Sequence, residues 1–265
     1  MSALGFVGGH GMSDLITMDD LSNDEILEIL DTAERLLPVA NGDVYAPLLQ
    51  GKVLGNLFFE NSTRTRMSFE SAMKRLGGEV VNLSSVGSSV AKGETLYDTM
   101  QMVDGYSDIA VIRHPHQGAA QYSADAIGIP ILNAGDGAGN HPTQTMLDLF
   151  TIRQAHGTLD GLNVVLVGDL RYGRTTHSLS HALVRFGAKL TLVSPDSLRM
   201  PTEIVGDLQS HDTEVIESED LSGSIADADV IYMTRIQKER FPDEDEYAKV
   251  AGIYKMTADN LAEAK

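Results

Sequence analysis

The stretch KVLGNLFFENSTRTRMSFE, residues 52–70, decides the fold. Its apolar first part, Lys52 to Phe59, predicts a short buried strand. Beyond a polar loop, apolar residues recur at helical spacing until two glycines interrupt them, namely Phe69, Ala72, Met73 and Leu76 before Gly77 and Gly78. A strand, a polar loop and the start of a helix are typical of the ligand crevice of a parallel α/β sheet.

The polar loop carries groups that suit a phosphate. Ser62, Thr63 and Thr65 offer hydroxyls, Arg64 and Arg66 offer guanidinium groups, and the following helix begins with unpaired backbone amides. Ser and Thr before a helix are often simple caps, and an arginine there is often a solvated side chain. However, cations are disfavoured at the positive end of a helix, so a pair of arginines indicates a bound anion.

The segment Ser62 to Arg66 resembles the carbamoyl-phosphate loop of the transcarbamoylase family, which comprises the aspartate and ornithine carbamoyltransferases. The resemblance implies that Ser62, Thr63, Arg64 and Thr65 hold the phosphate and that Arg66 pairs structurally. It runs through the chain from about Leu15 to Lys265, with several motifs in the same order as in the family.

Composition favours an intracellular globular protein. The chain has 265 residues, a formal net charge of -18 and no cysteine, which excludes disulfides and thiol chemistry. Strong acidity disfavours nucleic acid and anionic membranes as partners, and it would suit a salt-rich cytoplasm such as that of a halophile. The N-terminus lacks a signal-peptide pattern and no apolar run is long enough to span a bilayer, so we expect a cytoplasmic protein. Several of the few cations follow predicted strands or lie in adjacent loops: Arg64, Arg66, Lys92, Arg113, Arg174, Arg235 and Arg240.

Strand patterns alternate with helical patterns along the chain. The expected strands are Lys52 to Phe59, Glu79 to Leu83, Ile109 to Arg113, Ile129 to Asn133, Asn163 to Val167, Lys189 to Val193, Glu214 to Ile216 and Val230 to Met233. This alternation predicts an α/β fold of two domains, each a parallel sheet flanked by helices. We expect a loose tail over residues 1–12, with Met12 as an alternative start, and place the boundary within the helix Thr143 to His156. The resemblance makes residues 13–145 the carbamoyl-phosphate domain and residues 146–265 the aspartate domain.

The loop from Ser84 to Glu94 is rich in small and polar residues, and by composition alone it is a flexible solvated connection. The resemblance gives it another role. In the aspartate enzymes the corresponding loop reaches into the active site of the neighbouring subunit, and Ser88 and Lys92 are the matching residues. The resemblance therefore implies a homotrimer with shared active sites.

Two further segments match carbamoyl-phosphate contacts of the family. Arg113 ends a predicted strand, where a side chain points into the crevice, and it resembles the arginine that binds carbonyl and phosphate. The motif His141-Pro142-Thr143-Gln144 opens a helix with proline in its first turn. In the family its histidine bonds the carbamoyl oxygen and its glutamine holds the carbamoyl amine. No residues at zinc-ligand spacing accompany His141, so no metal is expected.

The segment Gly168 to Thr175 admits a second interpretation. Its glycines have the spacing of a nucleotide-binding loop between a strand and a helix. Arg174 replaces the lysine of that motif, bulky residues fill the loop, and Asp169 would repel phosphate. Resemblance to the aspartate enzymes explains the segment better, and it makes Arg174 a ligand of an aspartate carboxylate.

The segment Thr234 to Arg240 separates the two branches of the family. The ornithine enzymes bind a cationic side chain and carry another motif here, whereas Arg235 and Gln237 match the aspartate enzymes. Guanidinium groups bind carboxylates through two parallel hydrogen bonds, so Arg174 and Arg235 suit a substrate with two carboxylates. Glu239 is a candidate partner that would support Arg235.

The sequence and its resemblance together predict carbamoyl transfer from carbamoyl phosphate to L-aspartate, in pyrimidine biosynthesis and without a cofactor. Arg64, Thr65, Lys92, Arg113 and His141 would be catalytic, and Lys92, Arg174, Arg235 and Gln237 would bind aspartate. Transfer to another acceptor such as ornithine, and a non-catalytic binding subunit, stay open as alternatives. Whether regulatory chains bind also stays open. Family members continue beyond the position of Lys265 into a His-Pro-Leu-Pro loop and a final helix, so we expect the C-terminal end to be incomplete.

Overall fold

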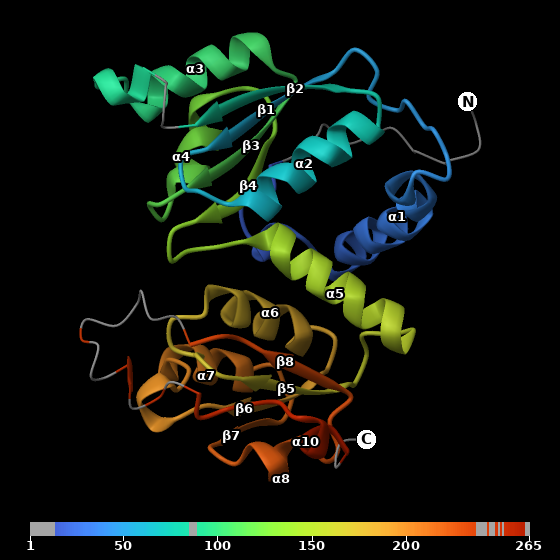
Figure 1. Ribbon diagram of the computed structural model, residues 1–265, viewed down its shortest axis with the longest axis vertical. Coiled ribbons are helices and arrows are strands. Elements are labelled where there is room, and N and C mark those ends of the chain that lie inside the picture. The colour runs from blue at the N-terminus through green and yellow to red at the C-terminus, as the bar shows by residue number, and fades with distance from the viewer. Residues whose placement is uncertain are drawn as a thin grey trace. The chain divides into compact units, whose positions relative to one another are not determined.

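The structure is a computed structural model that describes residues 14–84, 89–236, 243, 247–248, 250 and 252–262, and it contains two compact units (Figure 1). The first unit comprises Met1–Asp20 and Glu34–Thr143, and the second comprises Leu21–Ala33 and Gln144–Lys265. The first helix, α1 (Asn23–Asn41), therefore belongs partly to each unit. The family resemblance places all of this helix in the first domain, within residues 13–145.

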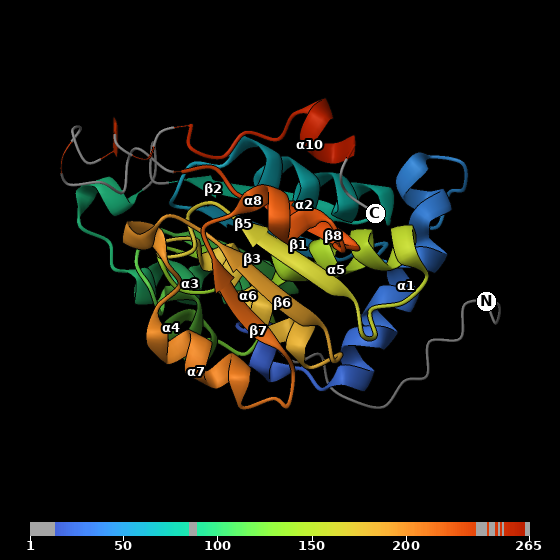
Figure 2. The same cartoon turned by 90° about the horizontal axis from the view of Figure 1, so that it is seen from below.

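Each unit is built on a four-stranded parallel sheet, with strand orders β2-β1-β3-β4 and β7-β6-β5-β8. The strands are β1 (Val53–Phe58), β2 (Glu79–Ser84), β3 (Ile109–His114), β4 (Ile131–Asp136), β5 (Asn163–Val167), β6 (Lys189–Val193), β7 (Val215–Ser218) and β8 (Val230–Met233). In Figure 2 the parallel strands β5, β6 and β7 lie side by side. The predicted fold class of parallel sheets flanked by helices is confirmed.

Helices follow most strands and cover the sheets. The remaining α-helices are α2 (Thr63–Arg75), α3 (Leu96–Tyr106), α4 (Ala119–Ala126), α5 (Pro142–His156), α6 (Arg174–Val184), α7 (Thr202–Gln209), α8 (Leu221–Ile225) and α10 (Ala258–Ala262). Short 3-10 turns are η1 (Met18–Asp20), η2 (Ser89–Lys92) and η3 (Asp196–Leu198). A capping box begins α1, because the Ser22 amide donates to Glu25 at 2.8 Å and the Glu25 amide donates to the Ser22 hydroxyl at 3.2 Å.

The first sheet buries apolar residues on both faces, as expected of a parallel sheet covered by helices. On one face Leu57 and Ile112 pack with Met100 of α3. On the other face Phe58 and Val111 pack with Met73 of α2. In the second unit, the face carrying Val165, Val167 and Val193 packs against Ile225 of α8. Among the described residues, no helix has both the length and the apolar character needed to cross a membrane.

One strand differs from its predicted bounds. The sequence predicts a strand from Ile129 to Asn133, but β4 runs from Ile131 to Asp136. Proline has no amide to donate to a sheet, so the ladder begins after Pro130, whose carbonyl still accepts from the Ala110 amide at 2.9 Å. The strand then continues through Asp136 across a register shift in its pairing with β3.

Candidate active site

Each sheet has one point at which successive connections leave in opposite directions. From β1 the chain passes to β2 on one side, and β3 lies on the other side; β5 is likewise flanked by β6 and β8. Ligands of open parallel sheets bind beyond the carboxyl ends of the strands at such switch points. The loops that follow β1 and β3, and those that follow β5 and β8, are therefore the candidate binding segments of the two units.

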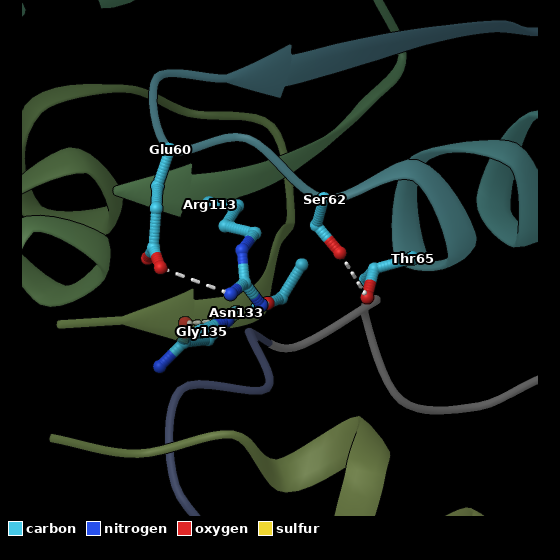
Figure 3. Close-up of polar contacts among 7 residues, drawn as sticks. Glu60, Ser62, Thr65, Arg113, Asn133 and Gly135 are labelled. Carbon is cyan, nitrogen blue, oxygen red and sulfur yellow. Dashed lines mark hydrogen bonds and ion pairs between the residues drawn. The ribbon is translucent and has the colours of Figure 1, made fainter. Parts of the chain in front are cut away.

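In the first unit, the loop after β1 leads directly into α2. Ser62 occupies the N-cap position with extended backbone angles of φ -156° and ψ 106°, yet its side chain makes no capping hydrogen bond. The Ser62 hydroxyl instead donates to Oγ1 of Thr65 at 2.9 Å (Figure 3). Arg64 and Arg66 lie in the first turn of α2 with exposed side chains. The hydroxyls, the guanidinium group of Arg64 and the positive end of α2 thus occur together, which suits an anion.

Arg113, at the carboxyl end of β3, is held beside this loop. Its side chain is only 11% exposed, and its terminal nitrogens donate to the Ala134 carbonyl at 3.0 Å and to Oε1 of Glu60 at 3.1 Å (Figure 3). Within the described part of the chain, its buried Nε has no hydrogen-bond partner. Glu60 belongs to the loop quoted above, but sequence reasoning gave it no role. No local pattern links these residues, which lie 53 positions apart.

A tight turn between β4 and α5 positions His141. The buried carboxylate of Asp136 accepts from the Gly118 amide at 2.8 Å and from the Asn140 amide at 2.6 Å, which ties the turn to the segment after β3. His141 itself is buried, and its Nδ1 lies 3.4 Å from the hydroxyl of Thr143. The direction of that contact depends on which ring nitrogen carries the proton. The turn therefore brings His141 to the same edge of the sheet as Arg113.

The remaining predicted ligands of carbamoyl phosphate are spread more widely. Lys92 ends η2 with an exposed side chain, and Ser88 lies outside the described residues. Gln144 falls in the second unit, where its side-chain amide donates to Oδ1 of Asp148 at 3.0 Å. Asp148 has no role in the sequence analysis. Its spacing of four residues from Gln144 on one helix was the available signal.

In the second unit, the loop after β5 uses its own backbone amides. Those of Gly168 and Leu170 donate to the Val193 and Leu198 carbonyls at 3.0 and 3.1 Å, and that of Tyr172 donates to the Asp169 carboxylate at 3.0 Å. A nucleotide-binding loop would direct such amides at a phosphate instead. The structure thus provides a further argument against the nucleotide interpretation of this segment.

Arg174 and Arg235 follow the two strands at the second switch point. Arg174 is the first residue of α6, behind Gly173, which has no side chain to cap the helix. Arg235 has an exposed side chain, and the Thr234 amide before it donates to the Val167 carbonyl at the end of β5, at 2.8 Å. Gln237 and Glu239 lie outside the described residues. The two arginines thus lie in the segments that follow two adjacent strands of one sheet, β5 and β8.

Packing in this unit also fixes the α6 start. The ring of His177 lies 2.7 Å from the Leu170 carbonyl through Nε2, and burial lowers the pKa of this histidine. His177 therefore favours its neutral form, in which Nε2 donates to the Leu170 carbonyl. Among the described residues there is no group of three or more histidine or acidic side chains that could hold a metal ion.

The fold and these segments define a two-unit α/β protein with arginine-bearing loops at the switch point of each parallel sheet. The chain belongs to the aspartate/ornithine carbamoyltransferase family: residues 13–154 match its carbamoyl-P binding domain and residues 160–265 match its Asp/Orn binding domain.

Proteins named aspartate carbamoyltransferase catalytic subunit are similar to this chain over most of its length. The one from Archaeoglobus fulgidus is 52% identical over 255 residues, which are 96% of this chain and 84% of the relative. The crystallised catalytic subunit of M. jannaschii aspartate transcarbamoylase has a TM-score of 0.88 and 50% identity, covering 94% of this chain and 82% of that one. The Trypanosoma cruzi enzyme, in complex with carbamoyl phosphate and aspartate, has a TM-score of 0.88 and 39% identity, covering 96% of this chain and 82% of that one.

Proposed function

We propose that this chain transfers the carbamoyl group of carbamoyl phosphate to the amine of L-aspartate, which gives N-carbamoyl-L-aspartate and phosphate. The observation that carries the proposal is that Arg174 opens the helix after β5 and Arg235 follows β8, the strand that pairs with β5. Two guanidinium groups match the two carboxylates of aspartate. They would repel the cationic side chain of ornithine, so we favour aspartate as the acceptor. Similarity to the T. cruzi enzyme crystallised with aspartate supports the same choice.

The phosphate end of the donor would bind in the first unit. We assign Ser62, Thr63, Arg64 and Thr65 to it, because the start of α2 combines hydroxyls, a guanidinium group and a positive helix end. Arg66 lies in the same turn but receives no substrate role. Lys92 and Ser88 would add contacts to the phosphate, and Lys92 would also contact aspartate.

The carbamoyl group itself needs donors at its oxygen and an acceptor at its amine. Arg113, His141 and Thr65 would polarise the oxygen, and Gln144 would accept from the amine. When the neutral aspartate amine attacks the carbamoyl carbon, negative charge builds on that oxygen until the bond to phosphate breaks. Donors that are already oriented stabilise this charge without reorganising, and Arg113 is held in such a way by Glu60 and the Ala134 carbonyl. Positioning of the two reactants would supply the rest of the rate enhancement.

Arg174, Arg235 and Gln237 would orient aspartate. Arg174 is the first residue of α6, so the backbone amides at the start of that helix would join its guanidinium group in binding a carboxylate. Replacing Arg235 with alanine should therefore raise the KM for aspartate steeply and leave the KM for carbamoyl phosphate nearly unchanged.

We further propose a homotrimer in which Ser88 and Lys92 act in the active site of a neighbouring chain. The exposed Lys92 side chain is compatible with this role. A mixture of Lys92→Ala and Arg64→Ala chains tests it, because some mixed trimers would then hold sites with both residues intact. With random mixing, about a quarter of the sites should be intact, so activity should return to about that fraction. Activity that stays at the level of the separate variants would argue against shared sites.

The acceptor test is direct. Purified chain is incubated with carbamoyl phosphate and either aspartate or ornithine, and the carbamoylated product is quantified. We expect product from aspartate only, and a much higher aspartate concentration to be needed for it in the Arg174→Ala and Arg235→Ala variants. Product from ornithine would reject the aspartate assignment, whereas tight binding of carbamoyl phosphate without any product would favour a non-catalytic binding subunit.

A further inference from the structure

Gln144, in the first turn of α5, has an amide whose orientation decides what it can bind. Its nitrogen Nε2 donates to Oδ1 of Asp148 at 3.0 Å, one helical turn further along. An ionised carboxylate only accepts hydrogen bonds, so only the nitrogen end of the amide can face it. The oxygen Oε1 of Gln144 is therefore the atom left for another ligand, and it can only accept.

This orientation matches the chemistry of a carbamoyl amine. The amine of a carbamoyl group carries two N–H donors, and conjugation with the carbonyl leaves it a poor acceptor. It therefore requires the oxygen end of an amide, as Asp148 enforces. If the Gln144 amide were reversed, its nitrogen would meet the amine donor to donor, and the contact would become repulsive.

Asp148 has a second partner on another element. Its Oδ2 accepts from the phenol of Tyr232 at 3.1 Å, and Tyr232 lies in β8, three residues before Arg235. The side chain of Thr175, next to Arg174, also hydrogen-bonds that phenol. One carboxylate thus connects the start of α5 to the strand end and the helix start that carry the two arginines, all within the second unit.

The surroundings of Asp148 indicate what holds the arrangement together. Burial raises the pKa of this carboxyl, while the hydrogen bonds from Gln144 and Tyr232 lower it. Burial and the neighbouring Asp148 also raise the pKa of Tyr232 to about 12, so the phenol stays protonated and remains a donor. A half-buried carboxylate that lost either donor would be left poorly solvated, so the donors and the carboxylate keep each other in place.

We propose that Asp148 is a positioning residue for carbamoyl transfer, which holds the amide of Gln144 with its oxygen directed at the carbamoyl amine. Through Tyr232 it also links that amide to the strand that leads to Arg235. The inference rests on the proposed function, because Gln144 can be a substrate ligand only if a carbamoyl group is transferred.

The experiment measures the effect of Asp148→Asn in the unchanged chain and in a chain that already carries Gln144→Ala. The asparagine has the same shape but can donate to Oε1 of Gln144 and so permits the reversed amide. We expect the kcat/KM for carbamoyl phosphate to fall about tenfold to a hundredfold in Asp148→Asn. In a chain that already carries Gln144→Ala, the same change should have little further effect, because Asp148 acts through Gln144.

Matched controls separate this role from a structural one. Gln121 donates to Asp125 at 2.9 Å with the same four-residue spacing on α4, so Asp125→Asn makes the same change in an exposed pair and should leave activity unchanged. If Asp148→Asn does not fold, the cycle of Tyr232→Phe with Gln144→Ala tests the same connection, with non-additive losses expected.

The outcomes also separate failure of the inference from failure of the proposed function. Full activity of Asp148→Asn, or losses that multiply with those of Gln144→Ala, would overturn the inference while carbamoyl transfer by the unchanged chain stands. If the unchanged chain forms no carbamoyl aspartate, the proposed function fails, and the positioning role fails with it.

Discussion

Gly168, directly after β5, lies close to the backbone of Thr234, directly after β8. Alanine at position 168 should therefore displace the segment that carries Arg235. The φ of Gly168 is +118°, and a Cβ built there would lie 2.3 Å from the carbonyl oxygen of Thr234. That oxygen belongs to the backbone immediately before Arg235, so it cannot move aside without displacing the arginine. Gly161 provides the matched control, since it has φ +66° and no heavy atom within 4 Å of an added Cβ.

Comparing the two glycine variants separates the backbone penalty from the overpacking penalty in the free energy of unfolding. A side chain in the left-handed region costs roughly 1–2 kcal/mol, and both variants carry this penalty. Overpacking against a fixed neighbour adds about 1–3 kcal/mol, and only Gly168→Ala carries it. The free energy of unfolding should therefore fall by roughly 2–5 kcal/mol in Gly168→Ala and by roughly 1–2 kcal/mol in Gly161→Ala. The difference corresponds to an additional drop in melting temperature of about 2–12 °C.

The assay combines thermal unfolding with steady-state kinetics. We expect Gly168→Ala to raise the KM for aspartate several-fold more than Gly161→Ala does, because only the first change displaces the backbone before Arg235. The KM for carbamoyl phosphate should change little. Equal melting temperatures and equal aspartate KM values for the two variants would refute the argument that the close approach of Gly168 and Thr234 positions Arg235.

Three further predictions concern catalysis, pH and salt. Arg64→Ala and His141→Ala should each lower kcat about a hundredfold to a thousandfold, because these groups face charge that develops in the transition state. Arg66→Ala, in the same helical turn as Arg64, should retain activity. Similar kcat values for all three variants would contradict the assignment. The pKa of His177 is lower in the folded chain than in the unfolded chain. As the pH falls below the ordinary histidine pKa, the unfolded state therefore binds a proton before the folded state does. The free energy of unfolding decreases below that pH as a result. In His177→Gln, which keeps a donor for the Leu170 carbonyl, the drop in melting temperature between about pH 7 and pH 5 should be smaller, and an unchanged drop would exclude His177 as its source. Since the chain carries a formal net charge of -18, added KCl should raise its melting temperature by screening self-repulsion, and a melting temperature independent of KCl would show that repulsion is not limiting.

The central strands were predictable because they are largely buried and mostly apolar. Val164 to Val167 of β5 illustrates this, since it is an unbroken, buried apolar run that ends at Gly168. Helix starts were also predictable where the capping side chain bonds an amide three residues further along the chain, as Ser22 and Thr95 do. The end of β4 was not predictable, because Gly135 and Asp136 are residue types typical of turns, whereas Asp136 pairs with His114 of β3.

Less of the candidate site could be predicted from the sequence. Local sequence identified Arg64 and Arg66, since cations at the start of a helix conflict with the helix dipole. It could not identify contacts between distant segments: Glu60 meets Arg113 across 53 residues, and Tyr232 meets Asp148 across 84 residues. Such pairs depend on which strands become neighbours, and that order follows from the packing of the whole sheet.

The most direct test of the account is the formation of carbamoyl aspartate by this chain from carbamoyl phosphate and aspartate, measured at low and high KCl beside Arg235→Ala. The account predicts product from the unchanged chain, no product with ornithine in place of aspartate, and a much higher aspartate requirement in the variant. Absence of product at every salt concentration from a chain that melts cooperatively, or equal use of ornithine, would contradict it.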